Sequence, residues 1–184
     1  MAAPHDVIYG IEHGAAREYL PIAGKEIAAF VERIIKEKKP CTVVEVGVLV
    51  GYLTLHVARS LQQGCKVVGF EISEELARRA RENVAAADFA DRVTIVRADA
   101  RESLGTISGP VDVVILDAER TQYLNYLRKL ERVMSPGAVV IAIGTGGVSE
   151  RIRAYLDHVR MSGSYQSRTE TFGTENVEVS VYKG

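Results

Sequence analysis

The segment from Thr42 to Thr54 limits the fold more than any other part of this sequence. It reads Thr-Val-Val-Glu-Val-Gly-Val-Leu-Val-Gly-Tyr-Leu-Thr. The valines at its start form a β-branched run typical of a parallel strand that is buried on both faces. Gly47 and Gly51 then bracket a turn in which a Cβ would block the close approach of a ligand. Beyond the turn, the apolar spacing of residues 54–61 becomes helical, so the segment predicts a strand, a glycine turn and a helix.

An acid follows this unit at an informative interval. Glu71 ends a second predicted strand, Lys66–Glu71, twenty residues beyond Gly51. Nucleotide-binding βαβ units place a carboxylate at about this interval, where it accepts hydrogen bonds from the ribose hydroxyls. The pattern therefore predicts an adenosine-containing cofactor. The turn lacks both the G-x-G-x-x-G of nicotinamide dehydrogenases and the G-x-x-x-x-G-K-[ST] of P-loops, which disfavours hydride and phosphoryl transfer.

Composition adds modest limits. The 184 residues are 47% hydrophobic and 26% charged, with a net charge of −1, as in an ordinary soluble domain without general attraction to nucleic acid or anionic lipid. No apolar run reaches the ~18 residues of a membrane span, and no secretory signal opens the sequence. Cys41 and Cys65 each precede a predicted strand and are not in a C-x-x-C pattern. We interpret them as structural thiols in a reducing cytoplasm.

Predicted strands and helices alternate along most of the chain. Ser73 is expected to cap a helix that begins with two glutamates, and a Ser135-Pro136-Gly137 turn is expected to precede the fifth strand. After a helix over about 149–161, two alternating strands joined by Gly173-Thr174 predict a hairpin. The predicted helices cover about 22–36, 54–61, 122–134 and 149–161, with a further one that begins after Ser73. The predicted strands cover 42–47, 66–71, 93–97, 111–117, 138–143, 164–170 and 176–182.

This alternation predicts an α/β fold. It is a Rossmann-like, doubly wound, seven-stranded sheet, mostly parallel with a C-terminal antiparallel hairpin and helices on both faces. Ligands of such sheets bind beyond the carboxyl ends of the strands, so functional residues are expected at or just after strand ends. The residues in such positions are Glu45, Gly47, Glu71, Asp99, Asp117 and Gly144.

At this point the chain resembles a family, the class I S-adenosylmethionine-dependent methyltransferases, in particular their catechol O-methyltransferase-like branch. The resemblance runs nearly the full length, from Gly24-Lys25 through the glycine turn with Tyr52 to Val181-Tyr-Lys-Gly184. It implies one domain over residues 1–184. Within it, residues 1–40 would form an N-terminal helical lid, 41–145 the cofactor-binding core, and 146–184 a C-terminal helix and hairpin.

The resemblance also implies cofactor contacts. Glu45 would lie near the methionine ammonium group, and Gly47 would let the backbone approach the methionine part. Glu71 would bind both ribose hydroxyls, and Asp99 would lie near the adenine, although an aspartate at that position could equally cap a helix. The other positions expected to line S-adenosylmethionine, or its product S-adenosylhomocysteine, are Gly51, Tyr52, Ile72, Ala100 and Asp117.

The catalytic positions depart from the family pattern. Metal-dependent members hold Mg²⁺ with a carboxylate after strand four and an Asp-Asn pair after strand five, and use a Lys as base. Asp117 matches the first ligand, but the strand-five positions read Ile143-Gly144, and Arg120 stands at the Lys position. Since Mg²⁺ needs several oxygen ligands, we expect no dedicated metal. Arg120 would stabilise an anionic acceptor and Asp117 would orient the acceptor or take its proton.

Three functions remain open from the sequence. The first is an active methyltransferase of the cytoplasm that methylates an oxygen of a small molecule. The second is a cofactor-binding homologue without activity, and the third is a methyltransferase acting on RNA or protein, which the near-neutral charge disfavours. The resemblance further implies an acceptor-contacting carboxylate near Glu170, and the edge hairpin would allow a homodimer.

Overall fold

The computed structural model describes residues 3–146 and 150–184. Its strands form a seven-stranded mixed sheet in the order β3-β2-β1-β4-β5-β7-β6, with helices around it. This confirms the predicted fold class. Contacts divide the chain into a first unit, residues 1–41 and 48–98, and a second unit, residues 42–47 and 99–184. The single-domain organisation and its three segments stay a prediction.

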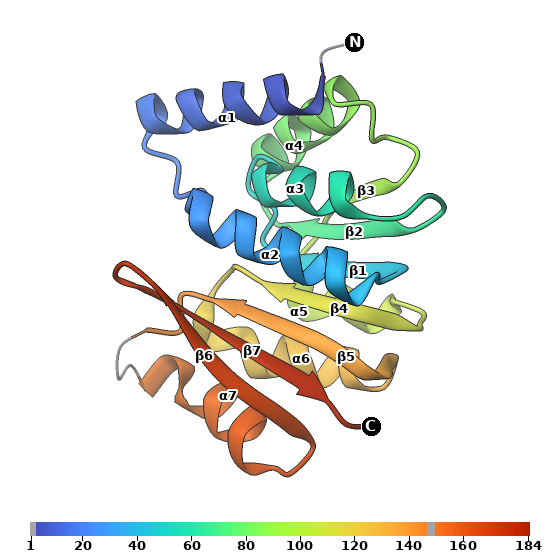
Figure 1. The fold of residues 1–184 in the computed structure, drawn as a ribbon, viewed down its shortest axis with the longest axis vertical. Coiled ribbons are helices and arrows are strands. Elements are labelled where there is room, and N and C mark those ends of the chain that lie inside the picture. The colour runs from blue at the N-terminus through green and yellow to red at the C-terminus, as the bar shows by residue number, and fades with distance from the viewer. Residues whose placement is uncertain (1–2, 147–149) are drawn as a thin grey trace. The chain divides into compact units, whose positions relative to one another are not determined.

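The first unit contains one parallel strand pair and four helices (Figure 1). β2 and β3 pair from Val67 opposite Val93 to Glu71 opposite Arg97. The helices pack against each other and on the strands through apolar faces, such as the one that buries Ile27, Val31 and Ile35 of α2. The elements are α1 (Pro4–Glu18), α2 (Lys25–Lys38), α3 (Tyr52–Ser60), β2 (Lys66–Glu71), α4 (Glu74–Ala86) and β3 (Val93–Arg97).

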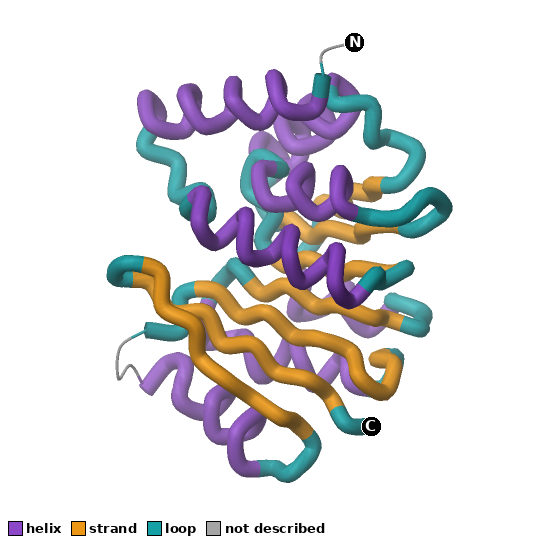
Figure 2. Tube along the Cα trace, viewed as in Figure 1, coloured by secondary structure: helices purple, strands orange, loops and turns teal. Residues whose placement is uncertain are grey.

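The second unit contains five strands. β1, β4 and β5 are parallel, and β7 and β6 continue the sheet as an antiparallel hairpin, which Figure 2 shows as a long pair of orange strands beside β5. α6 contacts β5, and α7 contacts β6. The elements are β1 (Thr42–Val46), α5 (Ala100–Ser103), η1 (Leu104–Thr106), β4 (Val111–Leu116), η2 (Arg120–Gln122), α6 (Tyr123–Glu131), β5 (Met134–Ile143), α7 (Glu150–Met161), β6 (Tyr165–Phe172) and β7 (Glu175–Tyr182).

One predicted turn is wrong. Ser135-Pro136-Gly137 lies inside β5, which begins at Met134 rather than Ala138. The pairing of β4 with β5 is irregular there, because Val111 lies opposite Met134 whereas Val113 already lies opposite Val139. The extra residues bulge between these two pairs, so Pro136 and Gly137, whose φ is +79°, fit within a strand.

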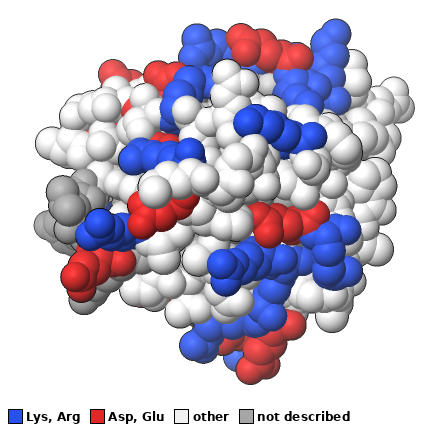
Figure 3. Space-filling view, turned by 90° about the horizontal axis from the view of Figure 1, so that it is seen from below, with Lys and Arg blue, Asp and Glu red and all other residues white. Residues whose placement is uncertain are grey.

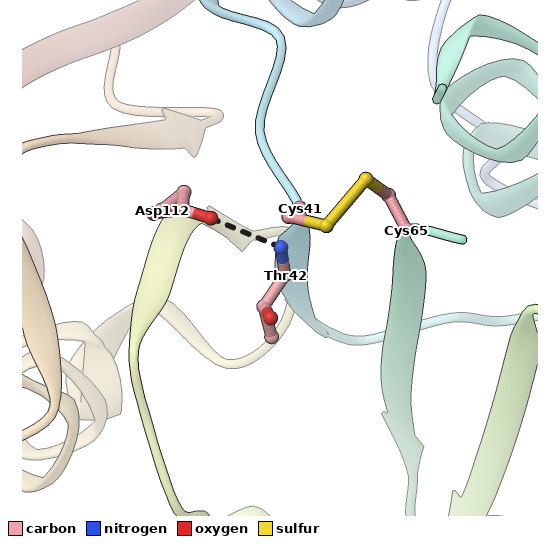
Figure 4. Close-up of a disulfide and its surroundings, with 4 residues drawn as sticks. All are labelled: Cys41, Thr42, Cys65 and Asp112. Carbon is pink, nitrogen blue, oxygen red and sulfur yellow. Dashed lines mark hydrogen bonds between the residues drawn. A yellow bond between two sulfur atoms is a disulfide. The ribbon is translucent and has the colours of Figure 1, made fainter. Parts of the chain in front are cut away.

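The prediction of two free thiols is also wrong. Cys41 and Cys65 form a disulfide, with their Cα atoms 4.3 Å apart (Figure 4). The Lys66 N–H donates a hydrogen bond to the Cys41 carbonyl, 2.9 Å, and this bond brings the two cysteine backbones together. The argument from cysteine usage to a reducing compartment therefore no longer stands.

Figure 4 also shows how β1 begins in the second unit. The Thr42 N–H donates to Asp112 Oδ2, 3.0 Å. Outside the residues drawn there, the Ser135 hydroxyl donates to Asp112 Oδ1, 3.0 Å. One carboxylate of β4 thus binds the backbone N–H at the start of β1 and a side-chain hydroxyl near the start of β5, so the backbone donor of β1 has a partner.

Candidate active site

In the first unit, the glycine turn is held by backbone hydrogen bonds. The Val48 N–H donates to the Phe70 carbonyl, 3.3 Å, and the Gly51 N–H donates to the Val48 carbonyl, 2.9 Å. Leu49 and Gly51 have φ of +54° and +86°, and Gly51 is the N-cap of α3. A Cβ at Gly51 would make only ordinary contact with Ala80, so the glycine serves the left-handed backbone of the turn.

Glu71 is held at the end of β2 by that same turn. Its Oε2 accepts from the Leu49 N–H, 2.9 Å, and its Oε1 accepts from the Ser73 N–H, 3.0 Å. The side chain is fixed by these two donors and the residue is only 8% exposed. Each oxygen keeps a second lone pair, so the carboxylate can accept two further hydrogen bonds. Ile72, the next residue in the sequence, is 60% exposed, so a large apolar side chain is open to solvent just beyond β2.

Tyr52 lies in a buried polar cluster of the first unit. Its hydroxyl donates to Glu12 Oε1, 2.9 Å, and its ring packs edge-on against His56. Burial and the Glu12 carboxylate both raise the pKa of Tyr52. His56 in turn contacts Glu32 Oε1 through Nδ1, 2.5 Å. His56 is therefore a packed histidine, and the contact of Tyr52 with the cofactor stays a prediction.

The N-terminal segment forms a pocket with α4 within the first unit. Its volume is about 360 Å³, and Leu20 and an ion pair between Glu18 and Arg79, 2.8 Å, lie at it. Tyr9 and Tyr19 are 60% and 92% exposed. The lid role of residues 1–40 stays a prediction.

In the second unit, Glu45 and Gly47 lie at the end of β1. Glu45 is 1% exposed, and Gly47 has a φ of +90°. A Cβ at Gly47 would overlap the Asp117 carbonyl oxygen. The Asp117 N–H also donates to the Val46 carbonyl, 2.9 Å, so the end of β4 lies directly against this glycine. Gly47 is thus required by the packing of β4, and its approach to a ligand stays a prediction.

Asp99 caps a short helix. Its Oδ1 accepts from the Arg101 N–H, 2.8 Å, and both carboxylate oxygens pair with the Arg101 guanidinium. This pairing holds the pKa of Asp99 below its usual range. The structure therefore shows the capping role that the sequence left open. Ala100, which follows, is buried, and a contact of either residue with adenine stays a prediction.

Asp117 follows the last residue of β4 and has an unusual charge environment. Burial, and then the Glu175 carboxylate, raise the pKa of Asp117 to about 6, while the Arg120 guanidinium opposes the shift. Asp117 is thus ionised above about pH 6 beside a cation and a second acid. Perturbed acids of this kind are candidates for proton transfer or substrate orientation.

Glu175 was not predicted from the sequence. It is the first residue of β7, and Ile143 at the end of β5 pairs with Val177, so β7 brings Glu175 to the end of β5. Glu170, the residue expected here, instead forms an ion pair with Arg168 on its own strand, 2.9 Å. The hairpin register decides between the two glutamates, and the sequence carries no signal for that register.

Residues 3–146 and 150–184 contain no group of three or more His, Cys, Asp and Glu side chains arranged to hold a metal ion. At Gly144, the residue that follows β5, an arginine side chain fills the space where a metal-binding side chain would project. Gly144 has a φ of +73°, and the Arg120 guanidinium lies where its Cβ would project. Arg120 and Asp117, the two predicted catalytic residues, therefore come together with Gly144 in the second unit.

Comparison with known proteins gives a consistent picture. The family model described as a methyltransferase domain matches residues 44–142. Catechol O-methyltransferase B of Danio rerio is 28% identical over 172 residues, which cover 89% of this chain and 64% of that protein. The catechol O-methyltransferase of Mycobacterium tuberculosis is 34% identical over 110 residues, 58% of this chain. The chain matches 64% and 50% of the lengths of these two relatives.

Solved structures show the same fold. The O-methyltransferase from Bacillus cereus, in complex with SAH, superposes with a TM-score of 0.89 and 22% identity over 97% of this chain and 91% of that one. TomG from Streptomyces achromogenes, in complex with SAM, superposes with a TM-score of 0.89 and 18% identity over 97% and 90%. Together with the match over residues 44–142, more than half of the sequence, these findings confirm the predicted resemblance: the chain belongs to the methyltransferase domain family.

Proposed function

We propose that this chain is an S-adenosylmethionine-dependent methyltransferase that transfers a methyl group to an oxygen of a small-molecule acceptor without a dedicated metal ion. The observation that carries the proposal is Glu71, whose carboxylate is held by the glycine turn at the position where cofactor-binding units place an acid. The family match and the names of the relatives, which are catechol and caffeoyl-CoA O-methyltransferases, support it.

The cofactor would be bound residue by residue as follows. Glu71 accepts hydrogen bonds from both ribose hydroxyls with its remaining lone pairs. Ile72, an exposed apolar side chain, packs on the adenine ring, and Asp99 with Ala100 approaches its edge. Glu45 and Gly47 approach the methionine part. The remaining predicted cofactor positions are Gly51, Tyr52 and Asp117.

The acceptor would meet Asp117 and Arg120. Asp117 orients the acceptor hydroxyl, and Arg120, which stays protonated, stabilises negative charge on its oxygen. A sulfonium methyl group is already activated, so holding the oxygen in line with it supplies much of the acceleration. This chemistry does not depend on the oxygen ligands that Ile143 and Gly144 lack.

Partners other than a small molecule find little support. Within the described ranges, no helix is long and apolar enough to cross a membrane. On the face drawn in Figure 3, Lys and Arg lie interspersed with Asp and Glu. A continuous positive groove for RNA is not seen on that face. The homodimer and the cytoplasmic location stay predictions.

Incubation with methyl-labelled S-adenosylmethionine and a panel of phenols and carboxylic acids tests the function, with EDTA and with added Mg²⁺. We expect label in a small-molecule product in both conditions. Cofactor binding without label in any product would indicate the inactive homologue, and label only in added RNA or protein would indicate the third function. Turnover that EDTA abolishes would contradict the metal-free proposal alone.

A further inference from the structure

Arg120 and Gly144 meet at the carboxyl ends of two parallel strands in the second unit. Leu116 of β4 lies opposite Ala142 of β5, so the residues that follow each strand are also neighbours. A Cβ at Gly144 would lie 2.5 Å from a terminal nitrogen of the Arg120 guanidinium and 2.8 Å from its Cζ. The guanidinium therefore occupies the space into which any side chain at position 144 would project.

The backbone on both sides of Gly144 is fixed. The Ile143 carbonyl accepts from the Tyr123 hydroxyl, 2.9 Å, and the Thr145 N–H donates to the Asn176 carbonyl, 2.9 Å. Ile143 and Thr145 are both buried. Because this backbone has little room to shift, a side chain added at position 144 would displace the guanidinium.

The N–H donors of the Arg120 guanidinium are not used by the described residues. Among residues 3–146 and 150–184 its side chain makes no hydrogen bond and no ion pair within 4 Å, and the residue is exposed. Its planar fork carries five N–H donors. The site therefore holds a cation whose N–H donors are available to a ligand.

The same residues do not fit a divalent metal ion. Mg²⁺ demands near-octahedral oxygen coordination, but Gly144 brings no side chain, and the next residue, Thr145, is buried and donates its hydroxyl to the Asn176 carbonyl, 3.2 Å. A positive guanidinium beside Asp117 would also repel a second cation. The donor set is incomplete and the local charge has the wrong sign.

We propose that the Arg120 guanidinium, seated against Gly144, binds the acceptor oxygen as an anion, so that the enzyme selects phenols acidic enough to ionise near neutral pH. This inference rests on the proposed methyl transfer and names its acceptor class. The phenolate oxygen forms a bond to the methyl carbon, and the carbon–sulfur bond breaks with its electron pair going to sulfur. The negative oxygen and the positive sulfonium both become neutral. Before this step the phenol loses its proton, either to the Asp117 carboxylate that orients its hydroxyl or to solvent.

A series of substituted phenols tests the acceptor class. We expect kcat/KM at neutral pH to rise as the phenol becomes more acidic, with 4-nitrophenol methylated faster than phenol and with no effect of EDTA or Mg²⁺. In the complex with S-adenosylhomocysteine, the absorbance of 4-nitrophenol should show that it binds as the phenolate. A Mg²⁺ requirement, or binding of the neutral phenol only, would overturn the inference.

Arg120→Ala tests the cation directly. We expect it to lower kcat/KM for 4-nitrophenol about 100-fold, the usual effect of removing one preorganised donor, without changing the affinity for S-adenosylmethionine. Added guanidinium ion at low millimolar concentration should restore part of the activity, whereas urea, which is neutral and similar in shape, should not. Unchanged turnover in Arg120→Ala, or rescue by Mg²⁺, would contradict the inference.

Gly144→Ala tests whether the Arg120 guanidinium must lie against Gly144, and this variant has a matched control. Gly163 has a φ of +83°, close to the +73° of Gly144, but an added Cβ there would meet nothing within 4 Å. Gly163→Ala therefore carries the same backbone strain without displacing a guanidinium. We expect Gly144→Ala to lose phenol methylation as Arg120→Ala does, while Gly163→Ala keeps it. Full activity in Gly144→Ala would contradict the claim that the contact with Gly144 positions the Arg120 guanidinium.

Cofactor binding distinguishes a wrong acceptor class from a wrong proposed function. If calorimetry shows bound S-adenosylmethionine but no phenol in the series is methylated, the acceptor class is wrong and the cofactor site stands. If neither cofactor binding nor turnover is found, the proposed function itself fails.

Discussion

Single residues carry most of the candidate site, and Gly47 illustrates how. Its φ of +90° and its closeness to the Asp117 carbonyl leave no room for a Cβ. We expect Gly47→Ala to lower the free energy of unfolding by about 2–4 kcal/mol, from backbone strain and overpacking together. Gly64→Ala, with a φ of +82° and open space around it, should cost about 1–2 kcal/mol. If urea unfolding showed the same loss of unfolding free energy in Gly47→Ala and Gly64→Ala, the packing role of Gly47 would be contradicted.

The buried residues Glu32 and His56 predict a pH dependence of stability. Burial raises the pKa of Glu32, but hydrogen bonds from His56 and Arg59 outweigh it and hold the pKa below its usual range. Burial lowers the pKa of His56. Both groups bind protons more weakly in the folded chain than in the unfolded one. The stability linked to His56 is therefore present at neutral pH and is lost as the pH falls below about 6.5, whereas the stability linked to Glu32 is lost only below about 4.5.

Urea unfolding at pH 7, 6 and 5 measures this dependence. We expect the free energy of unfolding to fall across the series, and His56→Gln to flatten the slope between about pH 6.5 and 5. His13→Gln, at an exposed position, is the control and should keep the wild-type slope. Equal slopes in the wild type and His56→Gln would show that His56 does not govern the effect.

Helix α4 shows how an element supports the site without binding anything. The hydroxyl of its N-cap, Ser73, accepts from the Leu76 N–H, 3.3 Å, whereas the Ser73 backbone N–H donates to Glu71. Ser73→Ala removes only the first bond. We expect a loss of about 1 kcal/mol in unfolding free energy with unchanged affinity for S-adenosylmethionine. A large loss of affinity would mean that the cap, rather than the backbone N–H, positions Glu71.

Elements with strong local signals were predicted well. The predicted ranges of β2 and β3 agree with the structure, because β-branched runs between turn residues define them. The hairpin of β6 and β7 and the cap at Ser73 are likewise confirmed. The Ser135-Pro136-Gly137 turn was wrong because local turn chemistry was overruled by the pairing of β5 with β4. Register and tertiary pairing decide such cases.

The candidate site shows the same division. Glu71 and Asp117 could be predicted because they lie at the ends of predicted strands. The position of Glu175 near Asp117 and the contact of Arg120 with Gly144 depend instead on which strands pair and in what register. The disulfide escaped prediction for that reason too, since Cys41 and Cys65 are 24 residues apart and only the fold brings them together. Patterns along the chain report local structure and motif chemistry, and long-range contacts need the folded molecule.

At the scale of the whole molecule, the disulfide joins two cysteines that are 24 residues apart in the sequence and closes the chain between them into a loop. Loop-closure entropy predicts a stabilisation of about 3–4 kcal/mol for a loop of this length. We expect the double variant Cys41→Ser, Cys65→Ser to lose about that much in urea unfolding, and the wild type to lose the same on reduction. Counting free thiols by mass spectrometry before and after reduction is the control. Two free thiols in the unreduced protein would contradict the bond.

The central claim is that the chain binds S-adenosylmethionine through Glu71, and calorimetric titration with S-adenosylmethionine and S-adenosylhomocysteine tests it most directly. We predict micromolar binding of both that is indifferent to Mg²⁺, lost in Glu71→Ala, and kept in Asp91→Ala, where an exposed carboxylate of the same unit is removed. No binding of either compound to the folded wild-type protein would contradict the account and leave only the fold.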